Sequence, residues 1–235
     1  MNEKHLSSQF DSDLNNISSQ LMAMGGLVET QVHRAIAALA GFSATLAAEV
    51  IETDDQVDNM EVTIDRALTS IIALRQPTAR DLRLLLAISK ITTNLERVGD
   101  ETHKIARMVK SIVESGGARN MPIGDLRVAT DLAADLIHRA LDAFARLDVS
   151  AAIVIMKEDD LIDREFKGFT RKLITYMVED PRAISDSLNL LFLAKAVERI
   201  GDHAKNIAEF IIYIVKGTDV RHSSLTQVET ALQEP

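Results

Sequence analysis

The spacing of apolar residues constrains the fold of this chain more than any other feature of its sequence. From Leu84 to Ile112, and again from Leu190 to Ile214, apolar or small residues recur at steps of three and four. This spacing places them on one face of a long α-helix that packs against its neighbours at a shallow angle, as in helical bundles. Aromatic residues make up only 4% of the chain, and it has 10 Gly and 4 Pro. These values do not fit a β-sandwich or barrel, so we predict an all-α fold.

An internal repeat sets the number of helices. The segment ERVGDETHKIA (Glu96–Ala106) returns as ERIGDHAKNIA (Glu198–Ala208), 102 positions later. VHRAIAAL (Val32–Leu39) returns as IHRALDAF (Ile137–Phe144), 105 positions later. The change of three in the offset fits a deletion near the turn around Pro181, because loops tolerate deletions. The sequence therefore predicts two tandem three-helix bundles with six long helices.

The repeat also divides the chain. We expect residues 1–117 to form the first three-helix unit, residues 118–217 the second, and residues 218–235 a polar C-terminal tail that frays. The segment ESGGARNMP (Glu114–Pro122) is the predicted link between the two units.

Composition narrows the function. The net charge is −9 and no long run of Lys or Arg occurs, which disfavours nucleic acid as a partner because its phosphates need a basic surface. There are no cysteines, so disulfides and thiolate metal sites are excluded. The polar N-terminus lacks the apolar core of a signal peptide, and no apolar run approaches the roughly 18–20 residues that span a bilayer. These features predict a cytoplasmic protein with no membrane-spanning helix.

Paired carboxylates recur at matched positions. Asp58 lies 19 residues before Pro77 and Glu96 lies 19 after it; Asp54 and Asp100 lie 23 before and after it. Residues equidistant from the turn of an antiparallel helix pair lie at the same height, so these four carboxylates should meet. In the second unit, the carboxylates related in the same way to Pro181, within a residue, are Asp159, Asp163, Glu198 and Asp202.

Four carboxylates at one level repel one another unless they are protonated or bound to cations. Because all four ligands are oxygens, the pattern suits iron, manganese, magnesium or calcium, and also zinc. Gly99 and Gly201 are then expected to let a neighbouring helix or a metal cluster approach the backbone closely. His103, which follows Asp100, and His203, which follows Asp202, are candidates to ligate the metal or to hold its ligands. Glu61 is expected to be solvated.

These residues resemble those of the PhoU family of phosphate-signalling accessory proteins. The resemblance rests on AMGGLVE (Ala23–Glu29), the acidic pairs and the two ERxGD segments, and it covers nearly the whole chain. It implies two three-helix bundles whose acidic motifs bind metal, as multinuclear iron or as zinc. Asn206 fits the family pattern, as a residue that supports the ligands. Lys104 stands at the equivalent place in the first unit, which implies fewer metal ions or a different affinity there.

The resemblance also implies a pathway. It makes the chain a negative regulator of the phosphate-starvation response, which links the ATPase subunit of a phosphate ABC transporter to a sensor histidine kinase. It further implies a homodimer. Iron or zinc is the expected metal, with manganese or magnesium as the alternatives.

Two other function classes stay open at this point. One is a metal-free helical scaffold whose acidic faces bind basic partners. The other is a di-metal carboxylate enzyme, which needs a Glu-x-x-His motif on two helices. Gly99 and Gly201 stand three residues after Glu96 and Glu198, where that motif requires histidine. We therefore expect a regulatory adaptor and not an enzyme.

Overall fold

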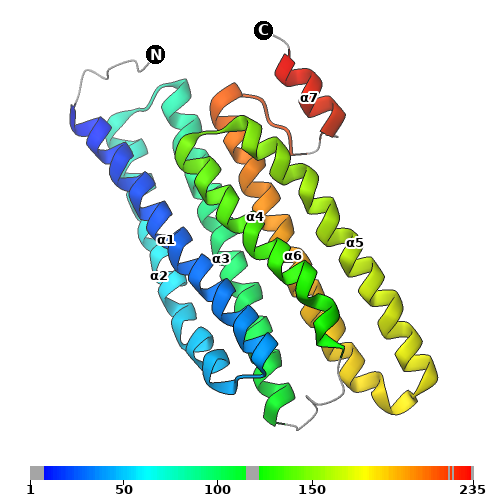
Figure 1. The fold of residues 1–235 in the computed structure, drawn as a ribbon. Coiled ribbons are helices and arrows are strands. Elements are labelled where there is room, and N and C mark those ends of the chain that lie inside the picture. Colours follow the sequence, from blue (N-terminus) through cyan, green and yellow to red (C-terminus); the bar gives the residue numbers. More distant parts are fainter. Residues whose placement is uncertain (1–7, 115–121, 222, 224, 234–235) are drawn as a thin grey trace.

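The computed structural model describes residues 8–114, 122–221, 223 and 225–233, and all of its regular structure is helical. Six helices are long and one is short (Figure 1). The elements in chain order are α1 (Ser8–Gly41), α2 (Ala44–Arg75), α3 (Ala79–Glu114), η2 (Ile123–Leu126), α4 (Arg127–Arg146), α5 (Val149–Glu179), η3 (Pro181–Ala183), α6 (Ile184–Lys216) and α7 (Leu225–Gln233). The predicted all-α fold with six long helices is confirmed. The predicted boundary between residues 117 and 118 lies outside the described residues.

The two units turn their first corner in the same way. Phe42 and Leu147 lie 105 positions apart, and both take a positive φ, of 48° and 51°. The next residue caps the following helix: Ser43 Oγ accepts a hydrogen bond from the Leu46 amide at 3.3 Å, and Asp148 Oδ1 accepts one from the Ala151 amide at 2.9 Å. Such caps satisfy backbone donors that a helix start leaves unpaired. The repeat seen in the sequence is therefore also a repeat of local structure.

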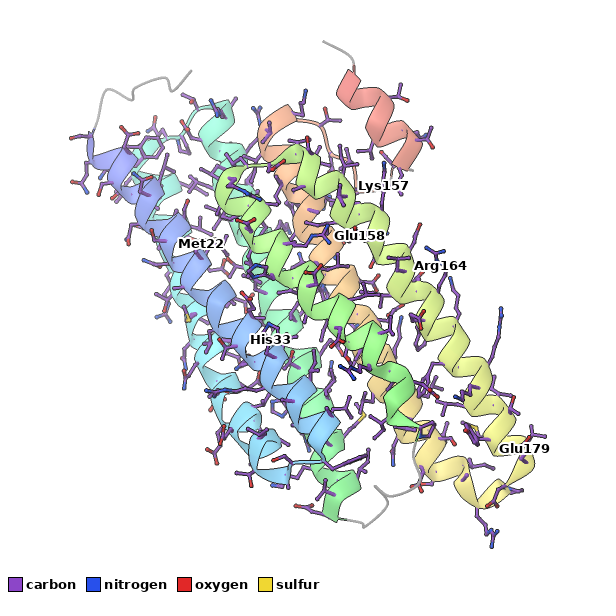
Figure 2. All side chains as sticks on the ribbon, viewed as in Figure 1. Met22, His33, Lys157, Glu158, Arg164 and Glu179 are labelled. Atoms are coloured by element: carbon purple, nitrogen blue, oxygen red, sulfur yellow. The ribbon has the colours of Figure 1, made fainter. Side chains whose placement is uncertain are left out.

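The two units share one hydrophobic core. Helix α3 packs along α6, while α1 and α4 lie side by side in front of them (Figure 1). Helix α3 runs toward the end of the molecule at which α6 begins, so these two helices are antiparallel (Figure 1). Side chains fill the spaces between the helices (Figure 2), and the buried apolar residues form a continuous cluster from Phe10 to Val228. The two predicted bundles are thus joined along their length.

The C-terminal segment differs from the expected frayed tail. Val220 and Val228 are buried, and α7 packs against α5. Two valines in a polar segment do not form a recognisable helical pattern, so the sequence did not predict this packing. Their burial nevertheless places the segment against the second unit. No described helix has the length and apolar character needed to cross a membrane.

Candidate metal centres

The first acidic set consists of Asp54, Asp58, Glu96 and Asp100, and the structure brings it together between α2 and α3. Burial raises the pKa of Asp58, and the neighbouring charges of Asp54 and Asp100 raise it further. His103 joins the set, since its Nδ1 is hydrogen-bonded to Asp54 Oδ2. The equal distances from Pro77 therefore place these side chains correctly.

Glu61 belongs beside this set, and its expected solvation is wrong. Its side chain is partly buried and accepts a hydrogen bond from Thr93 Oγ1 at 3.3 Å. Burial raises the pKa of Glu96 to about 7, and the charges of Asp100 and Glu61 add to this effect. Glu61 lies seven residues after Asp54, two helical turns along the same face, which is the signal that could have identified it.

A buried amide faces the first acidic set. Gln31 is 2% exposed, and its Nε2 donates to Thr53 Oγ1 at 3.1 Å. Its Oε1 is buried without a hydrogen-bond partner among the described residues. A Cβ added at Gly99 would lie 3.8 Å from this Oε1 and 3.8 Å from Asp54 Oδ1. These are ordinary contact distances, so an alanine would fit at this position. The expectation that a close approach requires glycine at position 99 is therefore wrong.

The second acidic set consists of Asp159, Asp163, Glu198 and Asp202, between α5 and α6. Burial raises the pKa of Asp202 to about 6, and the negative charges of Glu198 and Asp159 add to this effect. Three members of this set pair with lysines of the chain. Lys205 Nζ lies 3.0 Å from Asp159 Oδ2, Lys167 Nζ lies 3.5 Å from Asp163 Oδ2, and Lys195 pairs with Glu198.

Gly201 does allow a close approach, as predicted. A Cβ added there would lie 2.7 Å from Ile162 Cδ1 and 3.1 Å from Asp159 Oδ1. Asp159 is only 4% exposed. The second set is therefore packed more tightly than the first.

His203 and Asn206 lie against α3, where both bind the Asn94 side chain. His203 Nδ1 and Asn206 Nδ2 lie 3.0 Å and 3.1 Å from Asn94 Oδ1. Burial, and then the charge of Arg199, lowers the pKa of His203 to about 4, so its ring is neutral at pH 7. Since Asn94 Oδ1 only accepts, we assign the ring proton to Nδ1. The structure thus puts both residues in a polar contact between the two units.

Lys104 also faces the contact between units. Its Nζ lies 3.0 Å from Oε1 of Glu101, a carboxylate that is 3% exposed, and Arg199 Nη1 lies 3.0 Å from the same oxygen. Lys104 therefore neutralises Glu101 on the side of α3 that faces α6. Lys104 is thus paired outside the first set, so it gives no reason to expect fewer metal ions or a different affinity there.

The chemistry of the first set fits a divalent cation, although its ligands are not yet gathered around one point. Within the described part of the chain, no three His, Asp or Glu side chains are already arranged to hold a metal ion. The first set nevertheless offers carboxylate oxygens, the His103 imidazole and the unpartnered Gln31 Oε1. Such donors suit hard or borderline divalent cations.

The raised pKa of Glu96 predicts how stability depends on pH in metal-free protein. The folded state keeps this proton up to about pH 7, whereas the unfolded state loses it near 4.5, so stability falls as pH rises through this interval. Glu209, which is buried and also has its pKa raised to about 7, acts in the same direction. His203 acts oppositely, but only between about 4 and 6.5.

Because Glu96 and Glu209 lose their protons near pH 7 in the folded state, we expect metal-free protein to melt at a lower temperature at about pH 8 than at about pH 6.5. Glu96→Gln should reduce this difference and raise the melting temperature at the higher pH. The measurement is thermal unfolding followed by circular dichroism in the presence of a chelator. An equal drop in wild type and variant would contradict the assignment to Glu96.

Comparison with known proteins gives concordant matches. The PhoU domain family matches residues 21–109 and 126–211. The phosphate-specific transport system accessory protein PhoU homolog of Burkholderia sp is 49% identical, over 97% of this chain and 97% of that protein. The accessory protein PhoU of Escherichia coli (strain K12) is 46% identical, over 93% of this chain and 90% of that protein. The crystal structure of PhoU from Pseudomonas aeruginosa has a TM-score of 0.86 at 46% identity, covering 89% of this chain and 100% of that chain.

The matches agree with the fold and with its division into repeats. The two matched segments lie in α1–α3 and in η2–α6, so each three-helix unit carries one copy of the domain. The relatives are accessory proteins of phosphate transport, in agreement with the expectation that this chain is not an enzyme. The chain belongs to the PhoU family.

Proposed function

We propose that this protein is a metal-binding regulatory adaptor of phosphate homeostasis. The match to the PhoU family along both three-helix units carries this proposal, because the relatives are accessory proteins of the phosphate-specific transport system. In the proposed role the protein represses the phosphate-starvation response. It does so by linking the ATPase subunit of a phosphate ABC transporter to a sensor histidine kinase.

The proposed setting is the cytoplasmic side of the membrane. The protein would act there as a homodimer and reach the membrane only through these partners. The net charge of −9 supports protein partners and not nucleic acid.

The proposed metal, iron or zinc or else manganese or magnesium, would be held by carboxylates from two helices. In the first set these ligands come from α2 and α3, with His103 beside them. A bound divalent cation supplies positive charge that offsets their mutual repulsion. The chain's own contribution is to hold α2 against α3, so that carboxylates from both helices lie near one another. Metal binding would then stabilise the surface that partners contact.

The proposed role predicts an effect in cells. Deleting the gene should raise expression of phosphate-starvation genes in phosphate-rich medium, and the wild-type chain should restore repression. Asp58→Asn/Asp100→Asn should fail to restore it, because the first set then loses two negative oxygens needed for the cation. Expression is measured with a reporter fused to a promoter induced by phosphate starvation.

A matched control separates the metal from a general loss of charge. Asp131→Asn/Asp135→Asn also removes two exposed carboxylates, both on α4 and outside the acidic sets, and it should restore repression as wild type does. If deletion does not raise expression, the pathway is wrong. If deletion does so but Asp58→Asn/Asp100→Asn represses fully, the pathway stands and the regulatory role of metal fails.

A further inference from the structure

We infer that the two acidic sets are not equivalent: the first takes the divalent metal ion, and the second is neutralised by lysines of the chain and takes none. This inference rests on the proposed metal binding. It comes from comparing residues at equivalent positions of the two units, which the offsets of 105 and 102 define.

The partner of the most buried aspartate differs between the units. Asp54 and Asp159 are equivalent, and so are His103 and Lys205. His103 bonds to Asp54 and Lys205 bonds to Asp159, so the same contact is made by an imidazole in one unit and by an ammonium in the other. A neutral imidazole has a lone pair and can bind a metal, whereas an ammonium has only donors and already carries a positive charge.

A second exchange removes a carboxylate and adds a cation. Phe166 stands in the second unit at the position of Glu61, and Lys195 stands at the position of Thr93. In the first unit Thr93 donates to Glu61. In the second, the Lys195 ammonium lies 5.5 Å from the centre of the Phe166 ring and pairs with Glu198. The aromatic face favours a cation at that place.

The resulting charges differ strongly. The first set and Glu61 bring five carboxylates together, and no Lys or Arg in the described residues forms an ion pair with any of them. Arg97 acts on Glu96 only as a nearby charge. The second set has four carboxylates and three paired lysines, the third being Lys167 on Asp163. Only the first set therefore needs a cation from outside.

The space beside Gly99 and Gly201 also differs, and it is more open in the first unit. Ile162 stands at the position of Val57 and reaches within 2.7 Å of a Cβ added at Gly201, whereas the nearest Val57 atom is 3.5 Å from one added at Gly99. In the first unit the unpartnered Gln31 Oε1, on a side chain 2% exposed, faces this space. Leu136 stands at its position in the second unit. An acceptor without a donor points to a cation in the first site, and a leucine offers no ligand in the second.

Binding of Mn²⁺ alone tests the inference. Free Mn²⁺ is followed by electron paramagnetic resonance during titration of purified protein, and circular dichroism checks that each variant is folded. Asp58→Asn/Asp100→Asn should weaken Mn²⁺ binding by at least about tenfold. Asp163→Asn/Asp202→Asn, the equivalent change in the second set, should leave affinity and stoichiometry as in wild type.

A gain of binding gives the stronger result. Lys205→His/Lys195→Thr places the residues of the first unit in the second and should add a second class of Mn²⁺ sites. Lys172→His, which replaces a lysine paired with Asp125 outside the set, should add none. Loss of Mn²⁺ in Asp163→Asn/Asp202→Asn as large as in the first pair would overturn the inference but leave the proposed metal binding intact. No Mn²⁺ binding by wild type would overturn both.

Discussion

Gly25→Ala is expected to destabilise the protein by about 1–3 kcal/mol, the usual range for overpacking in a core. A Cβ at this position would lie 2.4 Å from Leu141 Cδ2, 3.0 Å from Cδ1 and 3.3 Å from Cγ. Leu141 is 4% exposed, so its whole branched end would have to move within a packed core. The clash lies where α1 meets α4, and the substitution therefore tests the contact between the two units.

The neighbouring glycine provides the control. A Cβ at Gly26 would have no atom within 4 Å, so Gly26→Ala should stabilise the protein by about 1 kcal/mol through helix propensity alone. Urea unfolding of both variants should then differ by about 2–4 kcal/mol. Shortening the obstructing side chain in Gly25→Ala/Leu141→Ala should cost less than the two single changes added together. Equal stability of the two glycine variants would show that α1 and α4 do not approach in this way.

Asn94→Leu is expected to cost about 2–4 kcal/mol, because it leaves the buried His203 Nδ1 and the partly buried Asn206 Nδ2 without an acceptor. Asn94 Oδ1 accepts from His203 Nδ1 and Asn206 Nδ2, and Asn94 Nδ2 donates to the Lys90 carbonyl at 2.8 Å. Both donors come from α6, so the loss would fall on the contact between the units. Urea unfolding measures the change in free energy. The chemical shifts of the His203 ring should also change, since the ring loses its hydrogen bond to Asn94, which fixes its tautomer.

Thr92→Val is the matched control two residues earlier on α3. Thr92 is fully buried, and its Oγ1 has no hydrogen-bond partner among the described residues. Replacing this hydroxyl with a methyl group removes an unsatisfied polar atom and should leave stability unchanged or raise it by up to about 1 kcal/mol. If Asn94→Leu is as mild as Thr92→Val, the network around Asn94 contributes little to the contact between α3 and α6.

The sequence predicts the helices well because their signal is local and repeated. Alternating steps of three and four define the buried faces of α3 and α6, and the turn at Pro77 fixes which carboxylates meet. The small residues of the segment MGGL fit either a helix bend or a close packing contact, and the sequence does not reveal that Leu141 is the neighbour of Gly25. Partners between the units depend on how α3 faces α6, and neither spacing nor composition determines that. This is why Asn94, Glu101 and the true place of His203 were missed.

For the candidate metal site, too, the sequence predicts some features and not others. Spacing along a hairpin identifies Asp54, Asp58, Glu96 and Asp100, since it depends only on helix rise. It gives no information on which cations pair with them, because a lysine side chain reaches several positions. Comparing the two units residue by residue would have revealed the exchange of His103 for Lys205. Lys104 is the more conspicuous difference between the two ERxGD segments, but its charge is directed to Glu101.

The antiparallel packing of α3 on α6 is the arrangement that a two-fold axis across the helices produces. Two identical three-helix chains can meet in this way, with each residue of one matched by the same residue of the other. In such a symmetric pair every substitution occurs twice, so one site cannot close while its twin stays open. Carrying both halves in one gene lifts this restriction. Mutations at positions 103 and 205 are then inherited separately, and each half is free to acquire its own chemistry on a shared scaffold.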